Sequence, residues 1–554
     1  MSKVRLSKSV LFLTVLCLVL SIFITGCSSK TADNGQSSAP AGSSSSSGSN
    51  SSGGSSSSNN QGTVAKDAKL TFWIEPDTEW LATAKTFNET PIAAELEKRT
   101  GVKVEYIHPA VGQTREQFNL MIASNELPDI IVYNWTTYPG GISKAFEDNV
   151  IIPLNEYFDK GMAPNFFKVL GSTEFEKLAK TDDGKFYAFT MIKDNDPSCI
   201  VWQGPVLRRD WLEELGLEVP TTIDEWYVVL KTIKENKNTD ATLSFLDSQI
   251  NTSHDFVGAY GTTRTFFQED GVVKYGPLLP AFKDFLATFS KWYADGLIDP
   301  DYITQDKKTY DAKVLSGRTG AFLGTPDGYV GTYIRLAREE NPDFDLVPAP
   351  HPTLNKGETP KFMQKEFNVS QNYSAAITSQ CKQVEVAVKW LDYLYSDEGR
   401  LLLNFGIEGT SYELVDGQPK YTDLIKNNPD KLTMKQAMAR YAICALGRWP
   451  GVQMKEPVRE QRFYPAQDEC VVVWSKAEET RRMPPLTLTP DESKRYAQIM
   501  TEIDTYFSEM YNKIVTGQLP VSEYDNVVEN MKKMGIEEAI KINQAALDRF
   551  NQRE

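Results

Sequence analysis

Histidine and cysteine are the residue types that most often hold a catalytic metal or act as nucleophiles, and this chain uses few of them. Its three histidines, His108, His254 and His351, are far apart, and none forms the HExxH pair of a zinc hydrolase. Four cysteines lie beyond residue 27 and match no metal-binding spacing: Cys199, Cys381, Cys444 and Cys470. One or two disulfides and free buried thiols both remain open for them. The sequence predicts no metal site, no cofactor and no catalytic residue.

Cys27 is the one residue whose surroundings predict covalent chemistry. A basic head at 1–8 precedes an apolar run at 10–24, and Gly26 stands directly before Cys27. This arrangement is typical of a secretory signal, and the run is too short and too near the terminus for a good spanning helix. The Ile-Thr-Gly-Cys ending resembles a bacterial lipobox, which implies cleavage after residue 26 and attachment of a diacylglycerol, with acyl chains such as palmitate, to Cys27. The alternative is an ordinary signal peptide with an incidental cysteine.

The segment after Cys27 fits an anchor. Residues 28–62 are mostly Ser and Gly and have almost no apolar side chains, so they cannot bury enough surface to offset the entropy of ordering. We therefore expect 1–26 to be a signal peptide and 27–66 a disordered tether. Together they predict a globular domain held at the extracellular face of a cell membrane.

The bulk composition limits the partners of that domain. The chain has 554 residues and a formal net charge of -15, so its global field disfavours nucleic acid and anionic lipid surfaces. No second apolar run is long enough to span a bilayer. The part from 67 to 554 is too long for one core, which predicts two lobes or more.

The start of this part alternates strand and helix patterns. Apolar stretches at 69–74, 102–107 and 129–133 are expected to be strands, and the stretches between them have helical periodicity around Leu96 and at 118–122. Strand, helix, strand, helix, strand predicts a parallel α/β sheet with right-handed crossovers.

Three later helices are expected from their ends or their periodicity. Thr222 and Glu225 form a capping-box pattern, and Thr489 with Glu492 forms another, with a proline at the first turn. The stretch 384–394 has apolar residues at helical spacing.

Short motifs along 67–554 come in a recognisable order. They are Leu127-Pro-Asp-Ile-Ile131, Asp183-Gly-Lys-Phe-Tyr-Ala188, Arg208-Arg-Asp-Trp-Leu212, Val219-Pro-Thr-Thr-Ile-Asp-Glu225, Gly296-Leu-Ile-Asp-Pro300, Ser316-Gly-Arg-Thr-Gly320, Trp390-Leu-Asp-Tyr-Leu-Tyr395 and Gly406-Ile-Glu-Gly-Thr410. In this order they resemble the extracellular solute-binding proteins, family 1, of ABC-type carbohydrate importers. Within that family they are most similar to the large oligosaccharide-binding lipoproteins of Gram-positive bacteria.

The resemblance implies a two-lobe α/β fold of the periplasmic-binding-protein-like type II class, with a ligand cleft between lobes that are joined by several chain crossings. Crossings are expected near 187–191, near 373–376 and around 425–440. The expected parts are 67–190 and 373–430 for the first lobe, and 191–372 and 431–554 for the second.

The function implied is capture of an oligosaccharide and its delivery to the permease subunits of an ABC importer, by a lipid-anchored monomer that is not an enzyme. Ligand would shift the population toward a closed form, because it contacts both lobes only there. Two alternatives stay open. One is a surface glycoside hydrolase or lyase with paired carboxylates, and the other is a sugar-sensing subunit for a membrane kinase.

A cleft for sugars needs aromatic faces for the C–H face of the ring and polar side chains for the hydroxyls. In parallel sheets such groups follow the carboxyl ends of strands. The ten loop residues predicted to bind ligand are Glu75, Asp77, Trp80, Trp135, Tyr138, Trp202, Asp327, Tyr329, Arg448 and Trp449. Four further tryptophans lie in helical patterns and are expected in the core: Trp211, Trp226, Trp292 and Trp390.

These residues also suggest the charge of the ligand. Carboxylates disfavour an anionic ligand, and Arg448 is the main cation among the ten, so a neutral or weakly acidic oligosaccharide is expected, stacked on Trp135, Trp202 or Trp449. Many large family members carry a calcium loop at the place occupied here by 235–241. That stretch lacks the glycines and has one suitably placed carboxylate, Asp240, so no calcium is predicted there.

Overall fold

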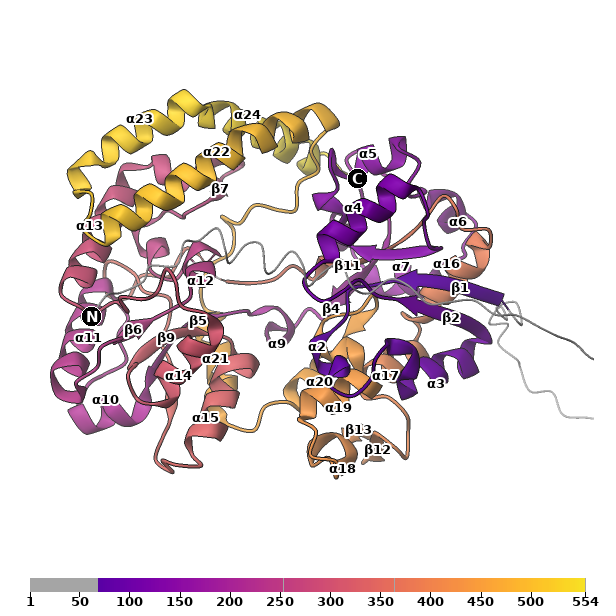
Figure 1. Cartoon of the computed structure of the whole chain (residues 1–554), viewed down its shortest axis with the longest axis horizontal. Coiled ribbons are helices and arrows are strands. Elements are labelled where there is room, and N and C mark those ends of the chain that lie inside the picture. The colour runs from indigo at the N-terminus through magenta and orange to yellow at the C-terminus, as the bar shows by residue number, and fades with distance from the viewer. Residues whose placement is uncertain (1–67, 253, 363, 554) are drawn as a thin grey trace, which may run out of the picture. The chain divides into compact units, whose positions relative to one another are not determined.

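The computed structural model describes residues 68–252, 254–362 and 364–553 (Figure 1). The expected signal peptide, Cys27 and tether lie outside this range. Within it, no helix is long and apolar enough to cross a membrane.

The first lobe is built on a six-stranded mixed sheet in the order β14-β4-β11-β3-β1-β2. Its strands are β1 (Ala68–Trp73), β2 (Val102–Ile107), β3 (Ile130–Tyr133), β4 (Phe189–Lys193), β11 (Val369–Ile377) and β14 (Val452–Gln453). β1 pairs in parallel with β2 and β3, as the sequence predicts. β11 enters antiparallel between β3 and β4, and β14 closes one edge parallel to β4.

Short helices and one hairpin accompany this sheet. They are α2 (Thr78–Leu81), α3 (Pro91–Thr100), α4 (Thr114–Ser124), α5 (Gly141–Glu147), α6 (Asn155–Asp159), α7 (Pro164–Leu170), α8 (Thr173–Ala179), α16 (Val384–Tyr393), α17 (Asp397–Phe405), α18 (Asp423–Lys426) and α19 (Met434–Tyr441), with one-turn helices at Phe87–Glu89, Trp135–Thr137 and Ile443–Leu446. The hairpin consists of β12 (Tyr412–Val415) and β13 (Gln418–Tyr421).

The second lobe has a four-stranded sheet in the order β10-β5-β9-β6. Its strands are β5 (Gly204–Arg208), β6 (Leu243–Ser244), β9 (Ala321–Gly324) and β10 (Leu346–Pro348). β5 is antiparallel to both neighbours, and β6 is parallel to β9. A separate hairpin, β7 (Phe266–Glu269) with β8 (Val272–Tyr275), lies against the last helix of the chain.

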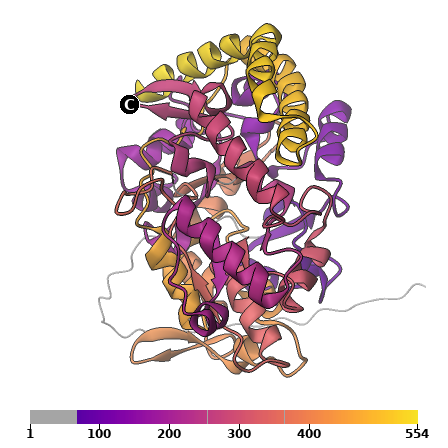
Figure 2. The same cartoon turned by 90° about the vertical axis from the view of Figure 1, so that its left-hand side faces the viewer.

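The helices of the second lobe come from two stretches of chain. They are α10 (Arg209–Leu215), α11 (Ile223–Lys237), α12 (Asp247–Thr252), α13 (Pro280–Ala294), α14 (Lys307–Leu315), α15 (Gly331–Ala337), α21 (Pro465–Trp474), α22 (Pro490–Val515), α23 (Tyr524–Met534) and α24 (Ile536–Asn551), with single turns at Val257–Tyr260, Gly276–Leu278, Pro326–Val330 and Val521–Glu523. α13 and α22 are far apart in the sequence but lie side by side (Figure 2).

The local signals in the sequence are confirmed where helices begin. Thr222 and Glu225 form a complete capping box at α11, and Thr489 and Glu492 form another at α22. The expected helix at 384–394 is α16. Each box satisfies backbone N–H groups that the first turn of a helix leaves without partners.

Each lobe has its own core. The first core gathers around Phe72, Trp390 and Trp449, and the second around Trp226 and Trp292. The core positions expected for Trp226, Trp292 and Trp390 are confirmed, and Trp211 packs partly buried against the second core.

The boundaries between lobes differ from those expected. Strand β4 runs to Lys193 and β11 begins at Val369, so the first sheet extends beyond the expected limits at 190 and 373. The larger difference is at 431, because α19, Trp449 and β14 belong to the first core. The chain leaves the first lobe after Gln453, since β14 needs β4 as its hydrogen-bonding partner.

Candidate functional site

Two chain segments that connect the lobes pair with one another like strands. Trp202 N donates to Gln364 O at 3.0 Å and Glu366 N donates to Ile200 O at 2.7 Å. At the end of strand β4, Lys193 N donates to the Asn368 carbonyl at 2.7 Å. Residues 194–203 and 364–368 are therefore held in a fixed register between the two sheets.

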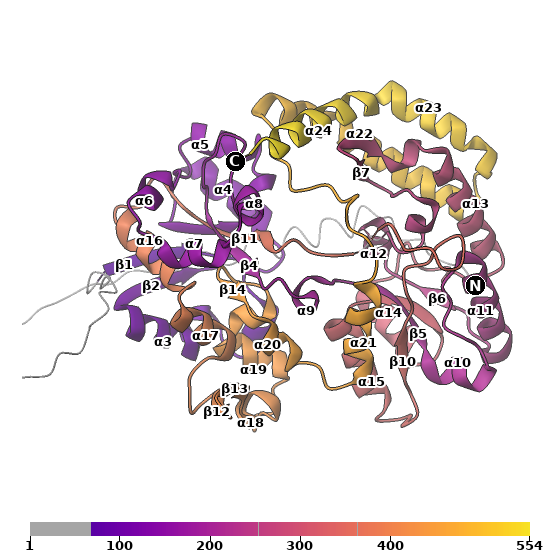
Figure 3. The same cartoon turned by 180° about the vertical axis from the view of Figure 1, so that it is seen from behind.

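A third segment, 454–464, joins them through side chains. Lys455 N donates to Asp194 Oδ2 at 3.0 Å, and Arg459 Nη2 donates to Asp196 Oδ2 at 2.8 Å. α9 (Pro197–Ile200) of the first segment and α20 (Lys455–Arg459) of the third are in contact between the lobes (Figure 3). We call these three segments, 194–203, 360–368 and 454–464, the crossing ribbon.

Trp202 is the predicted ligand residue that the structure exposes on this ribbon. Its side chain is 48% exposed, which is uncommon for an indole because burial of such a ring strongly favours folding. The neighbouring Gln203 is buried, and its Nε2 has no hydrogen-bond partner among the residues that the structure describes. An exposed aromatic face beside an unpartnered amide suits a ligand that has both C–H faces and hydroxyls.

Asp327 and Tyr329 lie on one side of the ribbon, in the single turn at 326–330 of the second lobe. Arg462 Nε donates to Asp327 Oδ1 at 3.0 Å, and the Arg462 side chain is almost fully buried. Burial lowers the pKa of Arg462, but Asp327 and then Asp468 outweigh it, so its pKa is raised and it stays cationic. Tyr329 is partly buried, and Lys307 Nζ lies 4.7 Å from its ring centre.

Glu75, Asp77 and Arg448 come together at the first lobe. Asp77 caps α2 by accepting from Glu79 N at 2.7 Å, and its other oxygen accepts from Arg448 Nη1 at 2.6 Å. Glu75 is exposed. Burial raises the pKa of Tyr373, and the charge of Arg448 lowers it. The charges of Asp77 and Glu75 raise this pKa further, so the Tyr373 phenol lies close enough to interact electrostatically with Arg448, Asp77 and Glu75. Tyr373 was not among the sequence candidates, and its position at the expected second crossing is the signal that could have included it.

The other four predicted ligand residues are buried in the first lobe, contrary to the stacking role expected of them. Trp135 is fully buried, and its Nε1 donates to Ser374 O at 3.1 Å. Trp449 stacks on Phe87 with ring centres 4.4 Å apart. Trp80 packs against His108, and Tyr138 donates to Asp148 Oδ2 at 3.0 Å. These rings are packing residues in this structure, and contact of the six others with ligand stays a prediction.

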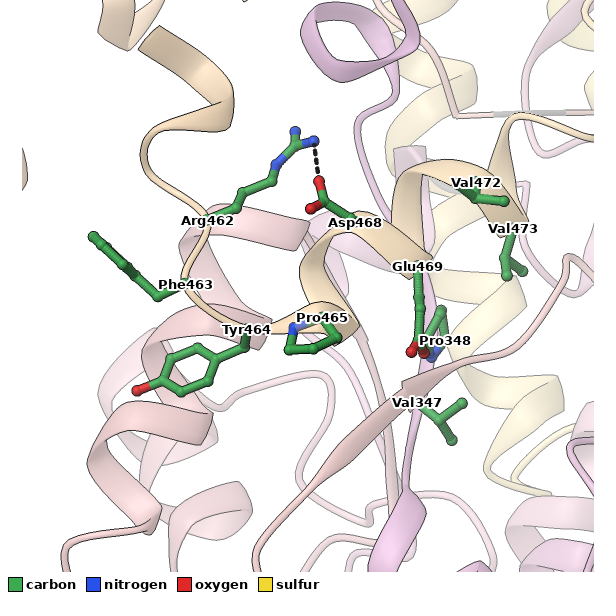
Figure 4. A pocket seen from close by; sticks show the side chains of 10 residues that line it. All are labelled: Val347, Pro348, Arg462, Phe463, Tyr464, Pro465, Asp468, Glu469, Val472 and Val473. Atoms are coloured by element: carbon green, nitrogen blue, oxygen red, sulfur yellow. Dashed lines mark hydrogen bonds and ion pairs between the residues drawn. The ribbon is translucent and has the colours of Figure 1, made fainter. Parts of the chain in front are cut away.

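A pocket of about 710 Å³ adjoins the end of the ribbon, between α21 and β10 (Figure 4). Arg462 and Asp468 form an ion pair of 3.2 Å at its rim, and Phe463, which is 60% exposed, points away from that pair. The volume of this pocket falls within the roughly 300–1,000 Å³ that is typical of small-molecule sites. Phe463 and Tyr464 were missed by the sequence reasoning, although an aromatic pair in a loop before a helix could have indicated them.

The stretch expected to lack calcium contains an ion pair. Asp240 accepts from Arg318 Nε at 2.9 Å and from Arg318 Nη2 at 2.6 Å, and hydrogen bonding to Arg318 lowers the pKa of Asp240. Among residues 68–553 as described, no three His, Cys, Asp or Glu side chains are grouped closely enough to hold a metal ion. Cys199, Cys381, Cys444 and Cys470 are free and buried, so the disulfide alternative does not hold in this structure.

Similar proteins were found by sequence and by structure. Lipoprotein LipO of Bacillus subtilis is 24% identical over 479 residues, which cover 82% of this chain and 88% of LipO. The fructooligosaccharide ABC transporter substrate-binding protein FusA of Streptococcus pneumoniae is 24% identical over 494 residues, 84% of this chain and 87% of FusA. The crystal structure of the alginate-binding protein AlgQ2 without calcium ion has a TM-score of 0.70 and 25% identity, and covers 87% of this chain and 98% of AlgQ2.

The family match spans both lobes. The model of the bacterial extracellular solute-binding protein family matches residues 85–401, which is more than half of the sequence. This range includes the first two crossings and both sheets except for β1 and the short edge strand β14. The chain therefore belongs to the bacterial extracellular solute-binding protein family.

Proposed function

We propose that this protein captures an oligosaccharide outside the cell and delivers it unchanged to the permease of an ABC-type importer. The observation that supports this most directly is Trp202, an exposed indole on a ribbon that joins two separate α/β cores. FusA is named for a fructooligosaccharide transporter and AlgQ2 for alginate binding, and both names support a saccharide ligand for this chain.

The crossing ribbon gives a physical route from binding to delivery. A ligand that touches residues of both lobes favours the conformation in which those residues are closest. The two cores would move as rigid bodies, so the bending would fall on the ribbon that connects them. Its segments would bend together, because they are hydrogen-bonded to one another. The permease would then recognise the closed form.

We further propose that the protein acts as a monomer anchored through acylated Cys27. LipO is named as a lipoprotein, which supports the lipobox interpretation. Cys27→Ala should leave the signal uncleaved or release the protein into the medium, whereas wild type should enter the detergent phase on phase separation. Cys199→Ala, at a buried thiol, is the matched control and should behave like wild type. Equal membrane retention of the Cys27 variant would contradict the anchor.

Binding itself is tested by calorimetry of the mature chain against neutral and acidic oligosaccharides, with chromatography of each sugar afterwards. We expect saturable binding, an unchanged sugar and a smaller radius of gyration by small-angle scattering. Turnover of a bound sugar would favour the hydrolase alternative. Failure of every oligosaccharide to bind would overturn the proposed function.

A further inference from the structure

A second, smaller pocket of about 210 Å³ lies in the second lobe, beside the ribbon segment 360–368. It is lined by His254, Thr263, Thr265, Phe266, Phe267, Lys361, Phe362, Glu479, Arg481, Arg482 and Met483. None of these residues was among the sequence candidates. Its volume is below the roughly 300 Å³ typical of drug-sized ligands, so it suits one sugar ring or one acidic group.

The walls of the pocket are joined by main-chain hydrogen bonds. Gln268 N, on the hairpin strand β7, donates to Arg481 O at 3.0 Å, and Glu478 N donates to Pro360 O at 2.8 Å. The Arg482 guanidinium donates to the Lys365 carbonyl of the ribbon. Two distant parts of the chain, the hairpin and the ribbon, thus hold the segment with the two arginines in place. A movement of the ribbon would change the shape of the pocket.

The side chains at this pocket have an excess of positive charge. Five cations share three carboxylates in the ion pairs around it: Lys274 and Arg481 with Glu269, Lys361 with Glu478, and Lys365 and Arg482 with Glu479. This local excess occurs in a chain whose formal net charge is -15. A cationic pocket in an acidic protein favours an anionic group at that place.

Arg482 is the cation with the weakest compensation. Its nearest carboxylate oxygen, on Glu479, is 3.8 Å away, and its guanidinium lies 3.5 Å from the ring centre of Phe367. Burial lowers the pKa of Arg482, and this effect outweighs Glu479 and Glu366. An added anion would therefore stabilise this buried charge.

Neutral and apolar groups complete the lining. Burial lowers the pKa of His254 to about 4, so the imidazole is neutral at pH 7, and its Nδ1 has no hydrogen-bond partner among the described residues. Phe267 and Phe362 are buried with their rings edge to face, and Arg481 lies 5.7 Å from the Phe362 ring centre. Two apolar rings beside two guanidinium groups match a sugar ring that carries a carboxylate.

We propose that this pocket binds one uronic residue of the oligosaccharide, with the carboxylate held by Arg481 and Arg482. This inference rests on the proposed function and narrows its ligand to an oligosaccharide with at least one acidic residue. A planar guanidinium fork binds a carboxylate through two parallel hydrogen bonds, which a hydroxymethyl group cannot accept. The same cations could take a free phosphate, so the experiment must separate a saccharide carboxylate from a small free anion.

The test uses matched pairs of trisaccharides and the full mature chain. Galacturonate, glucuronate and mannuronate trisaccharides are compared by calorimetry with the same sugars after reduction of their carboxyl groups, and with inorganic phosphate. At least one acidic trisaccharide should bind wild type tenfold or more tightly than its reduced partner. Arg481→Gln and Arg482→Gln should each remove most of that preference. Arg495→Gln is the control, because Arg495 pairs with Glu538 on the C-terminal helices.

Each outcome decides the proposal. Equal affinity for acidic and reduced trisaccharides in wild type overturns it, and this comparison does not depend on how the variants fold. An acidic preference that both arginine variants retain would also overturn the proposal. Inorganic phosphate that competes with the acidic trisaccharide at equal affinity would overturn it as well. Binding of reduced sugars without acidic preference would leave the proposed function intact, whereas absence of all saccharide binding would overturn both.

Discussion

Arg553, close to the end of the chain, donates from Nε to Asp182 Oδ1 at 2.9 Å and so fastens the C-terminus to the first lobe. Its Nη1 donates to the carbonyls of Lys177 and Lys180 at 2.7 and 2.8 Å, and its Nη2 donates to Thr487 Oγ1 at 2.8 Å. α24 packs on the second core, and the chain after it reaches the end of α8 (Figure 3). The lobes are thus linked by this contact as well as by the crossing ribbon.

Removing this link should destabilise the protein and loosen the lobes. Arg553 is buried, so Arg553→Ala leaves two carbonyls and part of the Asp182 carboxylate without their donor. Hydrogen bonds to charged groups contribute about 1.5–3 kcal/mol each, and since Arg549 still pairs with Asp182, we expect a loss of about 2 kcal/mol in the free energy of unfolding. Urea denaturation measures this, and scattering without ligand should show a larger radius of gyration.

Arg495→Ala is the control for this experiment. Arg495 forms an exposed pair with Glu538, and such pairs contribute about 0–1 kcal/mol. If both variants lost the same stability, the contact of Arg553 with the first lobe would have no special role.

The sequence predicted the elements that are set by local rules. β1, β2 and β3 follow from short apolar stretches, and α11 and α22 from capping boxes. Both signals lie within a few residues of the element that they predict. The third crossing could not be placed in this way. β14 has two residues, and its strand conformation depends on pairing with β4, which is distant in the sequence.

The candidate site was predictable only in part for a related reason. Trp202 and Trp449 both stand in loops beside polar residues, and the sequence does not distinguish them. Trp202 is 48% exposed, and Trp449 is enclosed by Phe72, Phe87 and Tyr106. Burial of a loop indole is decided by tertiary neighbours, and the pocket at Arg481 and Arg482 likewise depends on three distant segments.

Asp392 should make the stability depend on pH in the mildly acidic range. Burial raises its pKa to about 6, although Phe166 N and Asn165 Nδ2 donate to it at 2.8 and 2.7 Å. The folded state therefore binds this proton more tightly than the unfolded state, whose pKa is about 4. The contribution of Asp392 to the free energy of unfolding is fully present below about pH 4. It is lost as the pH rises through 6, and the loss is about 2–3 kcal/mol at most.

The variant Asp392→Asn isolates this effect. Wild type should lose the contribution of Asp392 to its unfolding free energy between pH 4.5 and pH 7.5. The variant has no such contribution to lose, so relative to wild type it should be more stable at pH 7.5 than at pH 4.5. Asp397→Asn is the control with the opposite sign, because hydrogen bonding to Lys168 lowers the pKa of Asp397. An unchanged pH profile in Asp392→Asn would contradict the assignment.

Calcium should not stabilise this protein through residues 235–241. Asp240 is the one suitably placed carboxylate there, and Arg318 already binds both of its oxygens. Calcium at one hundred times the dissociation constant of a site would add about 2.7 kcal/mol to the free energy of unfolding, which thermal unfolding detects easily. Extracellular calcium sites have dissociation constants of about 10⁻⁴–10⁻³ M, so calcium at about 10 mM would fill such a site. We expect the same Tm at that calcium concentration and in chelator. A calcium-dependent rise in Tm that Asp240→Asn abolishes would refute this prediction.

Trp202 should contribute directly to ligand affinity, and its removal should leave the fold intact. Because the side chain is about half exposed, Trp202→Ala should change the free energy of unfolding by about 0.5 kcal/mol or less. Loss of a stacked aromatic ring should weaken binding by about 1–3 kcal/mol, or roughly 5- to 150-fold. Calorimetry with the tightest oligosaccharide measures this. Phe463→Ala is the comparison, since Phe463 is similarly exposed but lines the pocket between α21 and β10. If Phe463→Ala weakened binding and Trp202→Ala did not, the ligand would occupy that pocket and the site proposed on the crossing ribbon would be wrong.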